Sequence, residues 1–305
     1  MTTRAVEVGA GIGWLRRAFD LGRANPRAIF GGAALLLVTL FVGAIGMSLL
    51  LVLASSALNA DPTASMVVSA IVGLGIVALM AAMMIGYLRL IHAVEEGRPA
   101  SAADVLTGFT DMAASGRAIG FMLLLTIAQY VLIIALVSVF AHDFGVWYID
   151  NLKTSMSGQP PVPMTSLPKG FGTAFVLMAV VGLFSYAVQA IGLGQIANGG
   201  AGIRGAFSDG VSGAVKNMLP FGLFLLLLLV ASIVLVLVFV LIGAIVAALA
   251  KIIGMWLFVL IGIPLYFAFV VAMMVVMFGV MYFVWRDICG DPADADEVRN
   301  DLIEA

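Results

Sequence analysis

The sequence predicts an all-α integral membrane protein with six transmembrane helices, grouped as three hairpins that each follow an amphipathic helix at the membrane surface. Composition is the first observation: the 305 residues are 63% hydrophobic and 10% charged, whereas a soluble domain carries about 25% charged residues. The second is a series of apolar runs long enough to cross a bilayer. The third is that a half-polar helix followed by such runs occurs three times. Lipid is therefore the expected solvent of most of the chain.

The first 27 residues predict a helix that lies on the membrane surface. Four apolar or small residues recur there at helical spacing: Ile12, Leu15, Phe19 and Gly22. Arg16, Asp20 and Arg23 fall on the opposite side, as expected for a helix at the level of lipid headgroups. Pro26 suits the first turn of the next helix, because the N–H groups of a first turn have no acceptor within the helix and the one that proline lacks is not needed there.

We expect the first span at about 28–58. Its apolar run, Ala28–Leu53, has 26 residues, whereas the core of a signal peptide has about 7–15, so the run is expected to stay in the membrane. The other spans are expected at 66–91, 117–140, 171–197, 221–250 and around Pro264, with further surface helices at 101–115 and 203–215.

The segment 141–170 is expected to be the one long loop. It contains Trp147 and Tyr148, residue types that favour the membrane–water boundary. Four prolines in its second half exclude regular structure there. After Arg286, the acidic residues 291–305 are expected to form a tail that stays in water.

The last third of the chain is its most apolar part. Residues 221–285 contain a single charge, Lys251. The thirty residues Phe221–Ala250 extend about 45 Å as a helix, against about 30 Å of hydrocarbon, so the fifth span must tilt or end early. Pro264 is expected to kink the sixth span or to mark its true start.

The distribution of basic residues predicts that both termini are cytoplasmic. With six spans, twelve of the 15 basic residues lie on the side of the termini: Arg4, Arg16, Arg17, Arg23, Arg27, Arg89, Arg98, Arg117, Arg204, Lys216, Arg286 and Arg299. The other three are Lys153, Lys169 and Lys251. Twelve against three agrees with the excess of Lys and Arg that cytoplasmic loops carry.

A surface helix and the hairpin after it form a unit that repeats within one transmembrane domain, residues 1–290, at about 10–92, 101–197 and 203–286. Phe19, Phe109 and Phe207 lie 90 and then 98 residues apart. Each is followed within two residues by an aspartate, and eight or nine residues later by a basic residue that opens a span. Self-similarity of this kind indicates a repeat architecture, here a pseudo-threefold one.

Short motifs mark the starts of the first and third units: Gly13-Trp14, Asn25-Pro26, Ala206-Phe207-Ser208 and Asn217-Met218-Leu219-Pro220. With them the chain resembles a large, uncharacterised family of bacterial inner-membrane proteins. In plan it is also similar to the membrane domain of some glycerophosphoryl diester phosphodiesterases, although no phosphodiesterase domain accompanies it. The resemblance implies a multi-pass protein of the bacterial inner (cytoplasmic) membrane, and it supplies no activity and no catalytic residues.

Neither an enzyme nor a metal or other cofactor is expected. None of the 17 acidic residues lies within a predicted span, although ion-coupled transporters usually keep an ionisable residue there. Cys289 is the only cysteine, and His92 and His142 are expected at opposite membrane faces. The chain has no metalloprotease, serine-hydrolase or phosphate-loop motif. Its net charge of −2 provides no basic field for nucleic acid.

Two sets of residues are candidates for function. Five basic residues beside the surface helices are expected to contact anionic lipid headgroups, although ordinary topology anchoring explains them equally: Arg23, Arg27, Arg117, Arg204 and Lys216. Four polar residues of the fourth span form a possible intramembrane cluster, although hydrogen bonding between helices also explains them: Ser185, Tyr186, Gln189 and Gln195.

Two functions fit these observations. One is a non-enzymatic membrane protein that contacts lipids or serves as an envelope scaffold. The other is a transporter or facilitator of a neutral or lipid-like small molecule. A protein partner or a homo-oligomer is compatible with both.

Overall fold

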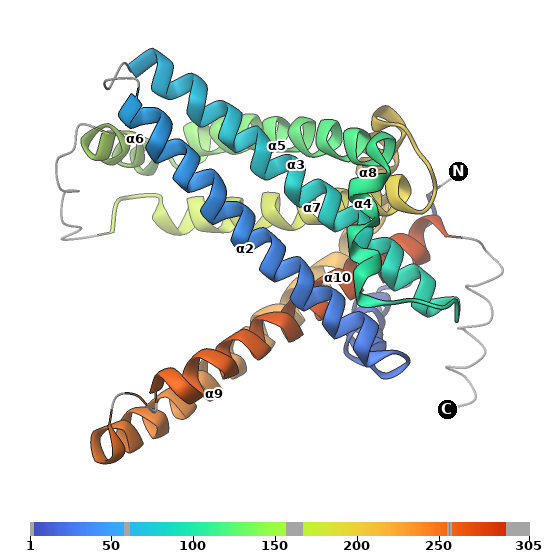
Figure 1. Cartoon of the computed structure of the whole chain (residues 1–305). Coiled ribbons are helices and arrows are strands. Elements are labelled where there is room, and N and C mark those ends of the chain that lie inside the picture. The colour runs from blue at the N-terminus through green and yellow to red at the C-terminus, as the bar shows by residue number, and fades with distance from the viewer. Residues whose placement is uncertain (1–2, 58–61, 157–166, 255, 257, 291–305) are drawn as a thin grey trace.

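The computed structural model describes residues 3–57, 62–156, 167–254, 256 and 258–290, and within them every regular element is a helix (Figure 1). Six of these helices are long and apolar enough to cross a membrane, as the sequence predicts: α2 (Pro26–Ala57), α3 (Pro62–Glu95), α5 (Met112–Phe140), α7 (Phe171–Ala197), α9 (Met218–Ile253) and α10 (Ile263–Cys289). The shorter elements are α1 (Ala10–Asp20), η1 (Leu21–Arg23), η2 (Ala102–Leu106), α4 (Thr107–Thr110), α6 (His142–Met156), α8 (Ile203–Lys216) and the π-helical turn η3 (Phe258–Gly262).

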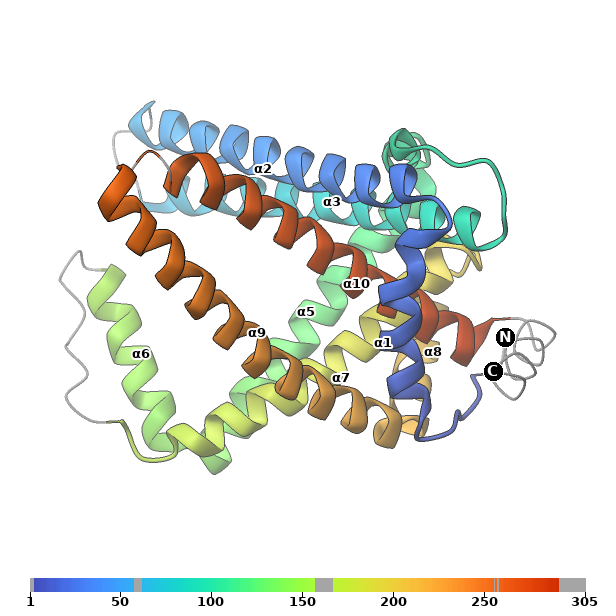
Figure 2. The ribbon, with the colours of Figure 1, turned by 90° about the horizontal axis from the view of Figure 1, so that it is seen from below.

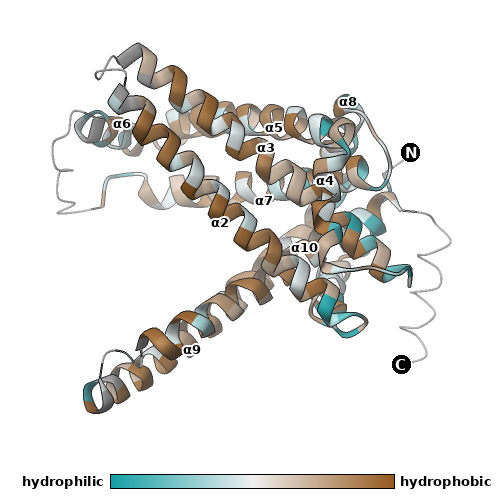
Figure 3. Ribbon diagram, in the orientation of Figure 1, coloured by the Kyte–Doolittle hydropathy of each residue, from teal (hydrophilic) through white to brown (hydrophobic). Residues whose placement is uncertain are grey.

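One end of the molecule is polar and tightly packed, and from it the long helices diverge. Figure 3 shows hydrophilic residues gathered around α4 and α8, with apolar residues along the spans. The described ends of the chain meet at this polar end, because the Arg4 N–H donates to the Ile288 carbonyl at 3.0 Å. In Figure 1, α9 and α10 leave it in a different direction from α2 and α3.

Each short helix near the polar end packs on the spans of the preceding hairpin. The pair η2 and α4 packs on α2 and α3, α8 packs on α7 and α5, and α1 packs on α10 and α9. At several of these contacts a glycine approaches a backbone carbonyl so closely that a Cβ would collide with it: Gly86 with Val105, Gly108 with Ala82, Gly210 with Val188 and Gly11 with Pro220. The first helix thereby packs on the last hairpin and closes the arrangement into a ring.

The sequence predicts one apolar and one polar side for α1, whereas the structure shows two different apolar faces. Ile12 and Phe19, which define its predicted apolar side, are exposed, as suits a face turned to lipid. A second face, with Trp14 and Ala18, is fully buried against protein. The helix therefore docks on α9 and α10 as well as offering apolar side chains outward.

The second predicted surface helix, 101–115, is wrong as a single element. Two short turns, η2 and α4, end at Asp111, whose backbone φ of −95° and ψ of 77° is not helical. The Asp111 carboxylate then accepts a hydrogen bond from the Ala114 N–H and so caps the next helix, which is the ordinary role of aspartate at this position. Residues 112–115 accordingly belong to the spanning helix α5.

The prediction of a loop throughout 141–170 is also wrong in its first half. α6 occupies His142–Met156 and precedes the prolines, which forbid a helix only after it. Trp147 packs beside Phe144, with ring centroids 5.7 Å apart, and Phe144 also contacts Phe171 at the start of α7. The Phe144–Phe171 contact holds α6 against the start of α7, and Val137 of α5 packs in the same small apolar cluster.

The fifth and sixth spans form an unequal pair. α9 has 36 residues, about 54 Å of helix, so it exceeds the hydrocarbon thickness as predicted. Pro264 lies in the first turn of α10 and marks the start of that helix. Figure 2 shows α9 and α10 close together at one end and far apart at the polar end, with α1 between them. The predicted acidic tail, 291–305, lies outside the described residues.

Candidate functional site

Of the four polar residues predicted to cluster in α7, three bond to three different helices. The Tyr186 hydroxyl donates to the Met277 carbonyl at 3.1 Å, and Gln189 Nε2 lies 3.9 Å from the Met84 sulfur. Gln195 Nε2 donates to Asp209 Oδ2 at 2.9 Å. Ser185 is buried on the same helix. The structure thus distributes these side chains among α3, α8 and α10, as expected for polar contacts between helices.

The space around Gln189 and Gln195 is filled by protein. Gly192 meets the Phe121 ring and Gly194 meets the Trp285 ring so closely that neither position has room for a Cβ. The Trp285 indole N–H also points at Gln195 Oε1, at 3.5 Å. This part of α7 fits the role of a packed helix junction rather than the lining of a polar passage.

The five predicted headgroup-contacting residues fall into two classes. Arg23, Arg27 and Arg204 are exposed at the polar end, and Arg23 forms an ion pair with Asp20 at 3.0 Å. By contrast, Arg117 Nη1 donates to the Gly200 carbonyl at 2.8 Å. Lys216 Nζ donates to both the carbonyl and the hydroxyl of Thr3, each at 2.9 Å.

An ion-pair network that the sequence did not reveal joins the helix ends. In α10, Asp287 Oδ2 accepts hydrogen bonds from Trp14 Nε1 at 2.8 Å and from Arg17 Nη2. Asp287 Oδ1 accepts from Arg17 Nη1 at 3.0 Å. Arg286 Nη1 donates to Glu95 of α3 at 2.9 Å. Asp287 and Glu95 lie in the spanning helices themselves, because α3 and α10 extend further than predicted, so these spans do contain acidic residues at their polar ends.

A second ion pair fixes α3 to the start of α5. Arg89 Nη2 lies 2.7 Å from Asp111 Oδ2, and Arg89 Nε donates to the Ala197 carbonyl at 3.0 Å. The N–H of Ala114 and then the Arg89 guanidinium stabilise the ionised carboxylate, and so they hold the pKa of Asp111 below its usual range. Both contacts lie at the polar end.

Residues 3–6, which we call the N-terminal clamp, join the α8–α9 corner to the end of α10. Asn217, fully buried at that corner, accepts from the Val6 N–H at 2.7 Å and donates to the Arg4 carbonyl at 3.0 Å. Thr3 pairs with Ser212 at 3.0 Å and with Lys216.

On its other side the clamp caps α10. The Arg4 guanidinium donates to the carbonyls of Asp287 and Arg286, and its backbone N–H donates to that of Ile288. These are among the last carbonyls of the helix, of which that of Arg286 also accepts from the Gly290 N–H at 2.8 Å. A cation at this end interacts favourably with the helix dipole. A single extended segment therefore satisfies groups on two separate elements.

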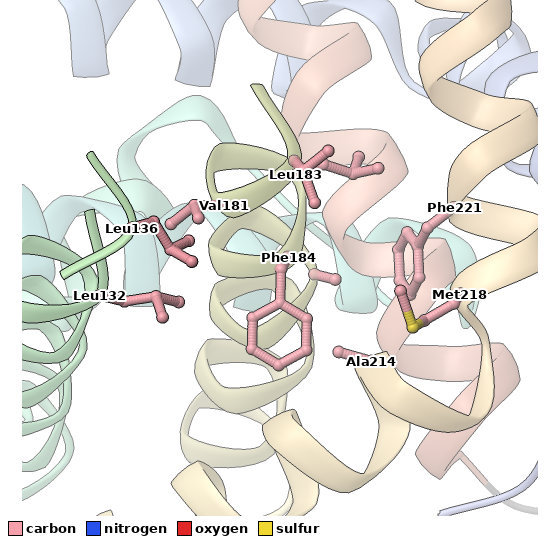
Figure 4. A pocket seen from close by; sticks show the side chains of 10 residues that line it. Leu132, Leu136, Val181, Leu183, Phe184, Ala214, Met218 and Phe221 are labelled. Carbon is pink, nitrogen blue, oxygen red and sulfur yellow. The ribbon is translucent and has the colours of Figure 1, made fainter. Parts of the chain in front are cut away.

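An apolar groove lies over α7, below this polar layer. It encloses about 310 Å³. Figure 4 shows α7 as its floor, with Leu132 and Leu136 of α5 on one side and Ala214, Met218 and Phe221 of the α8–α9 corner on the other. The α7 residues that line it are Val180, Val181, Leu183, Phe184 and Ala187. None of these ten side chains carries a hydrogen-bonding group other than the weakly accepting methionine sulfur.

The chemistry of the groove restricts what it can hold. A polar ligand would lose its hydrogen bonds to water there without replacement, at a cost of several kcal/mol. An alkyl chain that enters from the surrounding bilayer exchanges one apolar environment for another and loses no hydrogen bonds. Lys216 is not among the residues that line the groove, and its ammonium bonds Thr3 instead. The groove thus suits a hydrocarbon chain.

No family model matches the chain, and the comparisons with curated proteins and with solved structures give no significant match. The resemblance to bacterial inner-membrane proteins stays a prediction.

The groove and the clamp had no clear signal in the sequence. The groove lining consists of ordinary apolar residues, and its walls come from three separate parts of the chain. Asn217 belongs to the Asn217-Met218-Leu219-Pro220 motif, and its position directly before a 36-residue apolar helix is the signal that could have indicated a structural role at the α8–α9 corner.

Proposed function

We propose that this protein is a non-enzymatic, lipid-binding protein of the bacterial inner membrane, which holds one acyl chain of a membrane lipid in the groove over α7. The observation that carries the proposal is the wholly apolar lining of the groove. The volume is near the lower limit of small-molecule sites, about 300–1,000 Å³, so it suits one chain rather than a whole phospholipid. The surrounding bilayer supplies such chains in excess.

The polar end supports a role for anionic lipids. Arg23, Arg27 and Arg204 are exposed there beside the helices α1 and α8, and arginines near the membrane surface attract anionic headgroups. We place this face in the cytoplasm, together with both termini, because twelve of the 15 basic residues belong to it under the six-span topology.

We also propose that three elbow-plus-hairpin units arose as a pseudo-threefold repeat. The support is the ring of contacts in which η2–α4, α8 and α1 each pack on the preceding hairpin. In such a ring the same type of contact occurs three times, and the junction between α1 and the last hairpin is equivalent to the other two.

Filling the groove tests the lipid-binding proposal. Leu132→Trp and Val180→Trp place a larger ring in it from α5 and α7, at positions that are already exposed. The matched control is Leu49→Trp, at an exposed position on α2 away from the groove. Native mass spectrometry after extraction in a mild detergent should show phospholipid on the wild type and on Leu49→Trp, and less on both groove variants. Equal lipid on all four proteins would refute the proposal.

The alternative function, a facilitator for a lipid-like molecule, rests on the same groove because it opens sideways to lipid. A scrambling assay with fluorescent phospholipid in proteoliposomes separates the two. A binding protein leaves the transfer rate at that of empty vesicles, whereas a facilitator raises it, and Val180→Trp then lowers it again.

A further inference from the structure

The N-terminal clamp lies where it can control the groove. Asn217, which the clamp grips through the Val6 N–H and the Arg4 carbonyl, directly precedes Met218 of the groove wall. Phe221, one turn further on, is also part of that wall. Any displacement of the α8–α9 corner therefore moves one side of the groove relative to its floor on α7.

Beyond its base, where α1 packs on it, α9 is little covered by protein. None of its most apolar stretch, within Met218–Leu249, is buried by protein. At its base, Phe221 contacts Trp14 at 5.1 Å and Phe224 stacks on Tyr186 at 6.1 Å, between ring centroids. Further along, Phe239 packs against Phe269 of α10 at 4.4 Å. α9 is thus a long helix that contacts other helices mainly at its base and around Phe239.

The geometry of α9 and α10 makes the base the sensitive point. The two helices are far apart at the polar end, where α1 lies between them (Figure 2). The clamp bridges that separation, because it bonds Ser212, Lys216 and Asn217 on one side and the carbonyls of residues 286–288 on the other. The helix α1 also links the two helices, because Trp14 contacts Phe221 of α9 and bonds Asp287 of α10. Loss of the clamp therefore removes one of two links and leaves the α8–α9 corner less constrained.

We propose that residues 3–6 are a latch on the groove: when Thr3 and Arg4 leave the α8–α9 corner, α9 swings outward, the groove over α7 widens, and its lipid chain exchanges faster. This inference rests on the proposed lipid function of the groove.

Two substitutions weaken the latch in different ways. Thr3→Val keeps the shape of the side chain and removes the hydroxyl that meets Ser212 and Lys216. Asn217→Ala removes both contacts to the clamp from a buried position. Ser232→Ala is the control, because Ser232 is on the exposed surface of α9 and bonds only to the Leu229 carbonyl of its own helix. Thr3→Val changes only the N-terminal segment, so it carries the test if Asn217→Ala fails to fold.

The motion is measured by pulsed electron–electron resonance between nitroxides at Val176 of α7 and Leu226 of α9, both exposed, in a Cys289→Ser background. We expect Thr3→Val and Asn217→Ala to shift the distance distribution to longer values and broaden it, with Ser232→Ala unchanged. Exchange of bound lipid for a deuterated phospholipid, followed by native mass spectrometry, should accelerate about tenfold in Asn217→Ala, the effect of losing about one net buried hydrogen bond.

The outcomes separate the latch from the lipid function. Unchanged distances in folded Thr3→Val and Asn217→Ala protein would overturn the latch, even if the wild type carries lipid. Longer distances in a protein that retains no lipid would support the mechanical latch and would refute the proposed lipid function.

Discussion

Replacing Asp287 with alanine tests the contact that closes the ring between the first helix and the last hairpin. The carboxylate accepts hydrogen bonds from the Trp14 indole and from two nitrogens of Arg17. The Arg17 guanidinium also lies over the Phe283 ring, 4.8 Å from its centroid. In Asp287→Ala, the arginine keeps the ring contact and loses its counter-ion, while the indole N–H loses its acceptor.

The size of the effect follows from partial burial. The side chains of Arg17 and Asp287 are 23% and 21% exposed, so the pair lies between an exposed one, worth about 0–1 kcal/mol, and a buried one, whose disruption costs about 3–5 kcal/mol. We expect Asp287→Ala to lower the free energy of unfolding by about 2–3 kcal/mol. The control is Asp20→Ala, which breaks a pair with Arg23 that is 44% and 83% exposed, and it should cost less than about 1 kcal/mol.

Equilibrium unfolding in mixed detergent micelles, read from tryptophan fluorescence and circular dichroism, measures both changes. A double-mutant cycle with Arg17→Ala isolates the pair, and a coupling of about 1–2 kcal/mol is expected for residues in direct contact. Additive effects of Asp287→Ala and Arg17→Ala, or equal costs for Asp287→Ala and Asp20→Ala, would refute the docking of α1 on α10.

Two further predictions concern the second elbow. Gly86→Ala places a Cβ against the Val105 carbonyl and should destabilise the protein by about 1–3 kcal/mol through overpacking. The control is Gly46→Ala, which has open space around it and should change stability by less than about 1 kcal/mol. Similar melting temperatures for the two variants would contradict the tight contact. Because the folded state holds the Asp111 pKa below its ordinary value, this residue stabilises the protein above the carboxyl's unfolded pKa, about 3.9, and loses that contribution as pH falls through the lower folded pKa. Asp111→Asn keeps the helix cap and should remove that acid-dependent component from an unfolding titration between about pH 5 and pH 2; identical titrations would exclude Asp111 as its source.

The spans could be predicted from sequence because lipid imposes a simple rule. A helix that must satisfy its backbone hydrogen bonds in hydrocarbon needs a long apolar run, and the runs beginning near Pro26, Met112 and Met218 are unmistakable. Pro264 marked the start of α10 for the same local reason, since proline fits only the first turn.

The polar junction could not be predicted because its partners are far apart along the chain. Asp287 meets Arg17, and Asn217 meets the clamp, across separations of more than 200 residues. Neither charge pattern nor periodicity encodes such a pairing. The predicted cluster on α7 failed to converge for a related reason, because residues such as Gln189 and Gln195 share a sequence region and face different neighbouring helices.

The short helices were only partly predictable because amphipathic periodicity reports one apolar side. In α1, Ile12 and Phe19 gave the period, while the buried face depends on Trp14 and on the small residues Gly11 and Ala18. Small residues permit close helix contact and carry little hydrophobic signal. The same holds for Gly86 and Gly108 at the second elbow.

The central claim is that a lipid chain occupies the groove over α7. An electron cryomicroscopy map of the wild-type protein in nanodiscs of bacterial phospholipid tests it most directly. We predict elongated density between Leu132 of α5 and Met218 of α9. A groove closed by its own side chains, or a map with only ordinary boundary lipid around α7, would contradict the account.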